Sequence, residues 1–351
     1  MKISLNEFDS KRIENLNVTF QNNAIVLEVL ADFLNSRETS VTKAMTEEIS
    51  SCYDMPFETA FAMLLASACG LEIYENQVHK ALFNDYFMPA VKELDAKDFK
   101  DDLYLKTIKF PVKKFKNWEL KFSSYEPCEA FVYDEPVLTS DFREYPQIGF
   151  FRQEFSFPAV FQDGREWMAV KPNEIFTMQL PIENAHGNVL TFGLGLGYFA
   201  FLASMKKSVK TVTVVEKNAD IIELFSSEIL PQFPQKEKIR IIEGDAFEFS
   251  KDLKDYDYVF SDIWHDASDG LRQYLKLKNL HSKFPDITFD YWIEKSLLSN
   301  LRYTVFDGLY KVFKNSSKAP LAQDEKIIKT YREFTDMISD RGLKNIKVNV
   351  G

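Results

Sequence analysis

Three glycines occupy alternate positions in the stretch VLTFGLGLG, residues 189–197, between two apolar segments. Glycine has no Cβ, so Gly193, Gly195 and Gly197 allow a sharp turn and a close approach of the backbone to a ligand. A dinucleotide-binding G-x-G-x-x-G/A pattern would need Gly or Ala where Tyr198 stands, and no Lys-Ser/Thr pair follows the glycines as in a P-loop. The stretch therefore predicts either another kind of nucleotide-binding loop or a structural turn.

Acidic residues end three strand-like segments downstream of the glycines. Glu216 ends TVTVVE, Asp245 ends IRIIEGD and precedes Ala246, and Asp262 ends YDYVFSD. A carboxylate at the tip of the second strand can accept hydrogen bonds from both hydroxyls of a ribose, although a solvated strand-end Glu is the alternative. A short carboxylate followed by exposed backbone, as at Asp245, is suited to an adenine edge. These strand ends predict a nucleoside site.

From residue 172 onward, short apolar segments alternate with helix-like ones. This alternation predicts a Rossmann-like α/β fold, with a mostly parallel sheet and helices on both of its faces. KPNEIFTMQLPIENAHG predicts a helix that begins at Pro172, is kinked or divided by Pro181 and ends at Gly187. DITFDYWI is either the fifth strand or part of a helix.

Two different patterns precede this region. Residues 1–103 carry apolar residues at three- and four-residue spacing, which predicts a helical region. Residues 104–171 contain short strand-like pieces, YLKTIKFPV the first among them, and QDG at 162–164 predicts a hairpin turn. We therefore expect a helical region, a small antiparallel β-domain and an α/β domain over residues 172–351.

The glycine stretch and the strand ends together resemble the class I S-adenosylmethionine-dependent methyltransferases over about residues 172–295. The resemblance implies that S-adenosylmethionine is the cofactor, that Glu216 binds its ribose and that Asp262 lies beside its methionine part and the acceptor. Carried over by position, the cofactor-binding residues are Gly193, Gly195, Gly197, Glu216, Asp245, Ala246 and Asp262. The family often has an acidic residue two positions before the first glycine, where this chain has Thr191.

Residues after the fourth strand are candidates for the transfer step itself. Methyl transfer from a sulfonium is an in-line displacement, in which the protein mainly positions the nucleophile and the methyl group. Asp262 or His265 is placed to take a proton from an amine or hydroxyl acceptor, and the alternative for His265 is a solvent-facing loop residue. Trp264 is predicted to stack on the adenine or to shield the sulfonium, with packing under the loop as the alternative.

The chain also resembles spermidine synthase and its aminopropyltransferase relatives, which place a small β-domain before the same core. DGREWMAVKPNEIFTM resembles the joining segment, and Asp262 matches a catalytic Asp of that family. The synthases carry an acid in the glycine loop, where Leu196 stands here. We therefore expect a methyltransferase with an unidentified small-molecule acceptor. The alternatives are an aminopropyltransferase that uses decarboxylated S-adenosylmethionine, with SDIWHDASDG as the carboxylate-rich stretch, and a non-catalytic binding module.

Composition constrains the partners and the location. Lys and Arg number 43 against 53 Asp and Glu, and this formal charge of -10 argues against nucleic acid as the main ligand. The three cysteines form no CxxC pair, the histidines show no metal spacing, and the longest apolar run, residues 59–71, is too short to span a membrane. We expect a cytoplasmic protein without a signal peptide or metal site, whose first 170 residues shape the acceptor pocket or form a homodimer interface.

Overall fold

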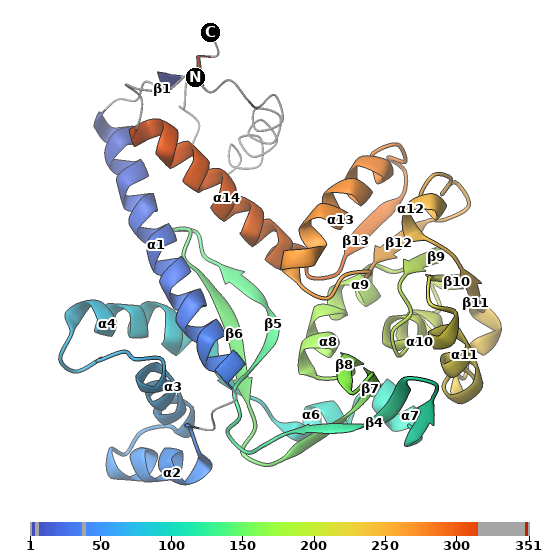
Figure 1. Cartoon of the computed structure of the whole chain (residues 1–351), viewed down its shortest axis with the longest axis horizontal. Coiled ribbons are helices and arrows are strands. Elements are labelled where there is room, and N and C mark those ends of the chain that lie inside the picture. Colours follow the sequence, from blue (N-terminus) through green and yellow to red (C-terminus); the bar gives the residue numbers. More distant parts are fainter. Residues whose placement is uncertain (1, 4–6, 37–39, 315–347, 350–351) are drawn as a thin grey trace.

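A five-stranded parallel sheet organises the C-terminal half of the chain (Figure 1). The computed structural model describes residues 2–3, 7–36, 40–314 and 348–349. The strands, in the order in which they lie in the sheet, are β11 (Ile239–Glu243), β10 (Val209–Glu216), β9 (Gly187–Phe192), β12 (Tyr258–Ser261) and β13 (Thr288–Tyr291). All neighbours pair in parallel, so the predicted Rossmann-like α/β core is confirmed. The DITFDYWI segment forms the fifth strand, β13.

Helices cover both faces of this sheet because its strands carry apolar side chains on both sides. In β9, Val189 packs in a cluster with side chains of α10 and α11 on one face. The next residue, Leu190, packs on the other face in a cluster that contains Ala246 of α12. The helices of this half are α10 (Tyr198–Met205), α11 (Ala219–Glu228), α12 (Ala246–Phe249) and α13 (Ala267–His281), with short 3-10 turns at Leu230–Gln232 and Lys236–Lys238.

The segment before β9 forms two short helices. They are α8 (Pro172–Thr177) and α9 (Gln179–Asn184). Pro172 occupies the first helical turn as predicted, but the helices divide at Met178, and Pro181 lies in the first turn of α9, where no intrahelical N–H bond is lost. The predicted helix end at Gly187 is wrong. Gly187 begins β9 with a φ of 62°, and a Cβ there would lie 2.1 Å from the Asp257 carboxylate.

Two small sheets stand where one antiparallel sheet is predicted. The antiparallel four-stranded sheet contains β3 (Lys113–Phe115), β4 (Trp118–Tyr125), β7 (Phe155–Gln162) and β8 (Arg165–Ala169). The three-stranded sheet contains β2 (Val91–Glu93), β6 (Glu144–Phe150) and β5 (Phe131–Leu138), and its β2 runs parallel to β6. The predicted QDG hairpin is confirmed: Asp163 and Gly164 join β7 to β8 with φ angles of 52° and 82°, as a type I′ turn requires.

The first predicted strand of this region, YLKTIKFPV, is wrong, because its residues 104–107 are helical, its residues 108–112 are in no strand, and β3 begins only at Lys113. Residues Leu103–Thr107 form the helix α7, which follows α6 (Ala96–Lys100). Asp102 caps α7, since its Oδ1 accepts a hydrogen bond from the Leu105 N–H at 3.0 Å. This cap, and the burial of Tyr104 among aromatic rings, outweigh the local strand pattern.

The N-terminal region is helical, and the last long helix packs against it. Its helices are α1 (Glu7–Ser36), α2 (Lys43–Cys52), α3 (Phe57–Ala68), α4 (Gln77–Leu82), a π-helical turn (Phe83–Phe87) and α5 (Met88–Ala90). From the sheet, α14 (Glu294–Lys314) runs to α1, where Phe306 stacks on Phe20 at 4.2 Å between ring centroids (Figure 1). Strands β1 (Lys2–Ile3) and β14 (Val348–Asn349) pair antiparallel. The C-terminal part of the chain thus contacts the N-terminal helices.

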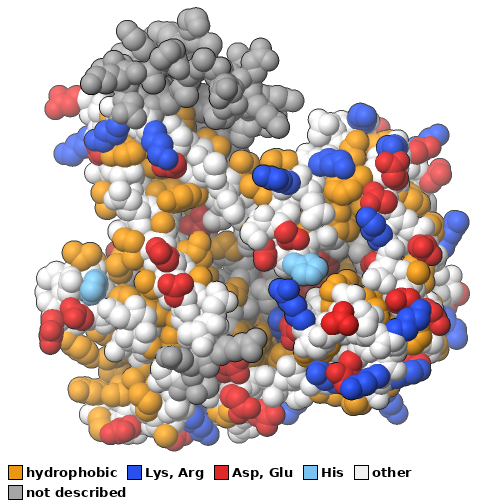
Figure 2. Space-filling model, in the orientation of Figure 1, with side chains coloured by type: hydrophobic (Ala, Val, Ile, Leu, Met, Phe, Trp, Pro, Cys, Tyr) orange, Lys and Arg blue, Asp and Glu red, His pale blue; other side chains and the backbone are white. Residues whose placement is uncertain are grey.

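The surface carries charges of both signs. Figure 2 shows acidic and basic side chains intermingled over the visible face. Large hydrophobic side chains are exposed on and around α2 and α4, among them Met45, Tyr53, Tyr74 and Val78. Within the described ranges, no helix combines the length and the apolar character that crossing a membrane requires.

Candidate functional site

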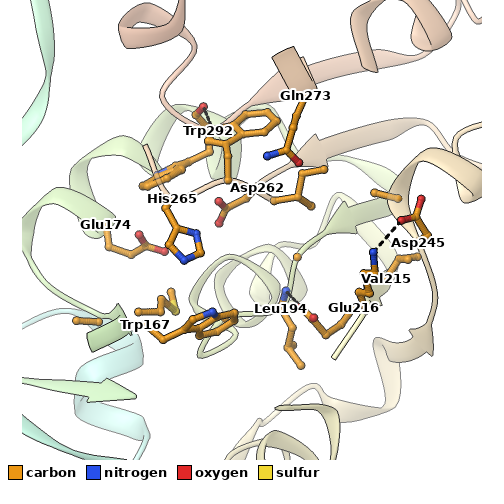
Figure 3. Close-up of a pocket in the computed structure, with 18 of the residues that line it drawn as sticks. Trp167, Glu174, Leu194, Val215, Glu216, Asp245, Asp262, His265, Gln273 and Trp292 are labelled. Atoms are coloured by element: carbon orange, nitrogen blue, oxygen red, sulfur yellow. Dashed lines mark hydrogen bonds and ion pairs between the residues drawn. The ribbon is translucent and has the colours of Figure 1, made fainter. Parts of the chain in front are cut away.

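A cleft of about 510 Å³ opens at the carboxyl ends of β9 to β12 (Figure 3). The strand order reverses between β9 and β12, which is where ligands bind in open α/β sheets. Of the residues predicted from the sequence, those that line the cleft are Gly193, Gly195, Glu216, Asp245, Ala246, Asp262, Trp264 and His265. Residues that sequence reasoning missed also line it, namely Trp167, Met168, Glu174, Gln273 and Trp292.

The three glycines have packing reasons of their own. Gly193 has a φ of 95°, and a Cβ on it would lie 1.9 Å from the carbonyl oxygen of Asp262. Gly197 caps α10 with a φ of 77° and lies outside the cleft lining, where a Cβ would meet the Phe225 ring at 2.4 Å. At Gly195 a Cβ would meet the Met168 sulfur at 2.4 Å. The fold alone therefore accounts for glycine at Gly193 and Gly197.

Backbone N–H groups of the glycine loop are already hydrogen-bonded within the protein. The Leu194 N–H donates to Glu216 Oε2 at 3.1 Å, and the Asn218 N–H donates to Glu216 Oε1 at 2.7 Å. The Leu196 N–H donates to the Met168 sulfur at 3.0 Å. A carboxylate has about four lone-pair sites, so Glu216 keeps acceptor capacity for a ligand while it braces the loop.

Asp245 is the N-cap of α12. Its Oδ1 accepts hydrogen bonds from the N–H groups of Phe247 and Glu248 at 2.9 and 3.2 Å. Burial acts to raise the pKa of Asp245, but these two bonds and Lys217 together hold the pKa below its ordinary value. Asp245 is thus ionised and fixes the backbone at Ala246, which begins α12 on the cleft wall.

Asp262 and Glu174 place two carboxyl groups in the same cleft. Figure 3 shows both pointing into it, Asp262 from the end of β12 and Glu174 from α8. Burial and the negative charge of Glu216 raise the pKa of Asp262 to about 7. Burial and the charge of Asp262 raise the pKa of Glu174 well above its ordinary value, against the opposing effect of Lys171. Both effects favour the protonated form, because burial and a second negative charge in the same cleft oppose ionisation of a carboxyl group.

The two remaining predicted residues, Trp264 and His265, lie in the loop after β12 and have different surroundings. Trp264 is 3% exposed, its Nε1 donates to the Trp292 carbonyl at 3.2 Å, and a Cβ on Gly270 would lie 2.7 Å from its ring. Trp264 thus packs under the loop, and because it also lines the cleft, its contact with the adenine or the sulfonium stays a prediction. The ring of His265 points into the cleft (Figure 3), and the residue is also exposed to solvent, so its role as a base stays a prediction.

The position of Glu174 in the sequence indicates the start of a helix and not a functional site. Glu174 stands two residues after Pro172, where an acidic residue favours the start of a helix. Nothing in the sequence shows that α8 faces the end of β12. The observation that indicates a functional role is the burial of a charged residue. This burial is visible only in the tertiary structure.

Comparisons with known proteins add little to this geometry. No protein-family model matches the chain, and no curated protein matches it. Among solved structures, the spermidine synthase of Thermotoga maritima is similar to this chain, with 12% identity and a TM-score of 0.32. The likeness covers 46% of this chain and 60% of that one. Values this low carry no conclusion about activity.

Proposed function

We propose that the chain binds S-adenosylmethionine in this cleft and transfers its methyl group to a small-molecule acceptor. The observation that carries the proposal is the set of three carboxyl groups, Glu216, Glu174 and Asp262, around one cleft at the switch point of the sheet. A nucleoside that also bears positive charge satisfies all three. The volume lies within the range of small-molecule sites, roughly 300 to 1,000 Å³.

The residues present fit such a cofactor. Glu216 has lone pairs left for ribose hydroxyls, and Gly195 and the turn at Asp245 and Ala246 bring backbone to the cleft wall. The Oε1 atom of Glu174 is buried and has no hydrogen-bond partner within the described part of the chain, so the cleft contains an acceptor that these residues leave unused. Such an atom costs free energy unless a ligand meets it.

The chain's own residues would then perform three tasks. Glu216 orients the nucleoside, and Trp167 and Trp292 form walls that exclude water from the cleft. Asp262, with a pKa of about 7, is able at neutral pH to accept a proton from an amine or hydroxyl acceptor. His265, at the same cleft, is a second candidate for that proton. The cofactor supplies, when bound, a methyl group on a positively charged sulfur.

Aminopropyl transfer is the alternative within the same site. Of the three carboxylates in SDIWHDASDG, Asp266 and Asp269 form a capping box at the start of α13, and only Asp262 lines the cleft. Glu174 supplies the second carboxylate that favours this alternative. Product analysis separates the reactions, because methyl transfer yields S-adenosylhomocysteine and aminopropyl transfer yields methylthioadenosine. Binding without either product, against a metabolite pool, would support a non-catalytic module.

Calorimetric titration with S-adenosylmethionine tests the proposal. We expect the unmodified protein to bind, Gly195→Arg to lose binding, and Glu216→Gln to bind at least about tenfold more weakly, which is about 1.4 kcal/mol. Glu216→Gln is preferable to Ala because its amide oxygen keeps one acceptor for the loop N–H groups. No binding by the unmodified protein contradicts the proposal.

Glu243→Gln is the matched control for Glu216→Gln. Glu243 pairs in register with Glu216 at the same end of the neighbouring strand β11 but is exposed and outside the cleft lining. We expect its affinity for the cofactor to equal that of the unmodified protein. An equal loss in both variants would show a general charge effect instead of a contact with the nucleoside.

A further inference from the structure

Glu174 is a buried carboxyl group that the fold does not satisfy. It is 6% exposed, lies in the first turn of α8 two residues after Pro172, and lines the cleft. Its Oε1 has no hydrogen-bond partner among the described residues. Buried carboxyl groups are normally paired, because leaving one without a partner costs free energy. A ligand group that meets this atom is therefore needed to explain its place.

The charged groups around Glu174 do not compensate it. Lys171 is the cation that acts on it, but the Lys171 ammonium is bound to Glu166 Oε1 at 2.7 Å. Asp262 is itself a carboxyl group, and the charge that acts on Asp262 is the negative charge of Glu216. His265 lines the cleft with them. The arrangement is thus an acidic site with one cation nearby that is already engaged.

Two buried hydroxyl groups complete the surroundings. Burial raises the pKa of Tyr104 and of Tyr198, and the negative charges of Asp102 and Glu174 add to this effect. The Tyr198 hydroxyl donates to Asp102 at 2.9 Å, and the Tyr104 hydroxyl donates to the Leu196 carbonyl. Both hydroxyl protons are therefore engaged with other acceptors and leave Glu174 unpaired.

We propose that Glu174 and Asp262 form a subsite for a primary ammonium group, and that the ammonium displaces a proton held by one of the two carboxyl groups. This inference rests on the proposed function and deepens it. A primary ammonium has three N–H donors and a compact charge, which suits acceptors on two sides. Because Asp262 has two oxygens, one remains available for the proton of an acceptor.

Neutral residues stand at two other positions where the resembled families often have an acid. Thr191 is 2% exposed in β9 and stands where an acid is common in the resembled methyltransferases, and Leu196 is 2% exposed where the resembled synthases have one. Glu174 reaches the cleft from α8, on the opposite wall. The ammonium belongs either to the methionine part of the cofactor or to an amine acceptor, and the probes below distinguish these sources.

The exchange is balanced in charge and atoms. Before binding near neutral pH, at least one of the two carboxyl groups holds a proton, so the pair carries at most about one negative charge. On binding, the ammonium keeps its three protons, the carboxyl O–H bond breaks, and the proton passes to the buffer. Binding of a group with one positive charge near neutral pH therefore releases up to about one proton.

Titration calorimetry in phosphate and in Tris near pH 7 measures this proton directly, since the buffers differ in ionisation enthalpy. The probes are S-adenosylmethionine, methylthioadenosine, which has no ammonium, and butylamine added to protein saturated with methylthioadenosine. We expect proton release with S-adenosylmethionine if the cofactor is the source, or with butylamine if the acceptor is. Methylthioadenosine alone should release none.

Glu174→Gln tests the assigned residue. We expect the proton-releasing probe to bind this variant at least about tenfold more weakly and to release less than half as much proton, with methylthioadenosine affinity unchanged. Glu183→Gln, on the exposed surface of α9, is the matched control for the loss of one negative charge and should behave as the unmodified protein. If the variant does not fold, proton release by the unmodified protein decides alone.

The outcomes separate this inference from the function on which it rests. Nucleoside binding without proton release by either ammonium probe, or with affinity independent of Glu174, overturns the subsite and leaves the proposed function intact. Failure of both nucleosides to bind contradicts the proposed function. The subsite is then tested with butylamine alone, by whether its binding releases a proton and whether its affinity depends on Glu174.

Discussion

The two walls of the cleft differ in how completely the protein provides hydrogen-bond partners for their polar groups. On the glycine-loop wall, the N–H groups of Leu194 and Leu196 have partners, and Gly193 is required by the close approach of the Asp262 carbonyl. On the opposite wall, Glu174 is buried with an oxygen that has no hydrogen-bond partner among the residues that the structure describes, and the pKa values of Glu174 and Asp262 are both raised.

This difference shows where evidence for a ligand lies. The glycine pattern is the most conspicuous feature of the sequence, yet packing explains much of it. The carboxyl pair is inconspicuous in the sequence, yet the folded protein holds it at a cost in free energy. Measurements of the free energy of unfolding should therefore distinguish the two walls. Substitutions in the glycine loop should lower it, whereas removal of a carboxyl group should raise it.

The largest effect is expected from Gly193→Ala. A Cβ at this position would lie 1.9 Å from a backbone oxygen, and φ is 95°, so steric overlap adds to backbone strain. We expect a loss of roughly 3 to 6 kcal/mol in the free energy of unfolding, measured in urea by tryptophan fluorescence. Gly70→Ala is the control, because Gly70 has a φ of 81° with nothing within 4 Å, and it should lose only about 1 kcal/mol. Equal losses would contradict the packing explanation.

Asp262→Asn should instead raise the free energy of unfolding, by an amount that depends on pH. The native carboxyl holds its proton up to a pKa of about 7, whereas the unfolded chain releases it near pH 4, so ionisation between these values destabilises the native state. The variant escapes this loss. Its free energy of unfolding, relative to the unmodified protein, should rise by about 2 to 3 kcal/mol between pH 5 and 8, with allowance for partial exposure.

Urea unfolding at several pH values measures this difference. Burial lowers the pKa of His281 to about 4, so its own contribution to stability is present at neutral pH and is lost as pH falls through about 6.5 to 4. That contribution occurs in both proteins and cancels in the difference. Asp286→Asn, at an exposed site, controls for the loss of one negative charge. A difference between Asp262→Asn and the unmodified protein that does not change with pH would contradict the carboxyl-pair interpretation.

Tyr104→Phe tests the attachment of the loop to the N-terminal half. The buried Tyr104 hydroxyl donates to the Leu196 carbonyl, which lies in the glycine loop. Its removal leaves that acceptor without this donor, and we expect a loss of about 1 to 2 kcal/mol in the free energy of unfolding. Tyr74→Phe, at a position 76% exposed, should lose nothing measurable. No loss in Tyr104→Phe would show that the loop holds its shape without this contact.

The smallest effect is expected from Met168→Leu. Leucine keeps the apolar volume beside Gly195 but cannot accept the hydrogen bond that Leu196 N–H donates to the sulfur. We expect a loss of about 0.5 to 1 kcal/mol, seen as a small decrease in the midpoint of thermal unfolding. Met205→Leu, in α10, is the control for exchanging a thioether for a branched side chain. A loss above that of Tyr104→Phe would reverse the order proposed for these two contacts.

The sheet and its strand ends could be predicted because they depend on local patterns. Alternating apolar segments and helices determine a parallel sheet, and the carboxyl ends of its strands then bring Glu216, Asp245 and Asp262 to one edge. Failures occurred where a local pattern met a stronger tertiary or capping interaction. YLKTIKFPV reads as a strand, but Asp102 caps a helix there, and Gly187 is required by a strand that lies against Asp257.

Residue types could be predicted for the site, but their roles could not. For Trp264, the sequence left a cofactor contact and packing as alternatives, and the structure shows a side chain that packs against Gly270 and also lines the cleft. For His265, the loop after β12 turns the ring into the cleft and also leaves the residue exposed to solvent, so its position alone does not assign a role. Residue spacing in the sequence does not determine where α13 or this loop lies in the fold.

By itself, the sequence determined the Rossmann-like core, the turn at the three glycines and the acidic strand ends, since apolar periodicity and glycine conformation act over a few residues. Only the tertiary structure decided that α8 faces β12 and thereby buries Glu174 beside Asp262. Burial and charge coupling depend on which distant segments meet, and no local pattern records that meeting.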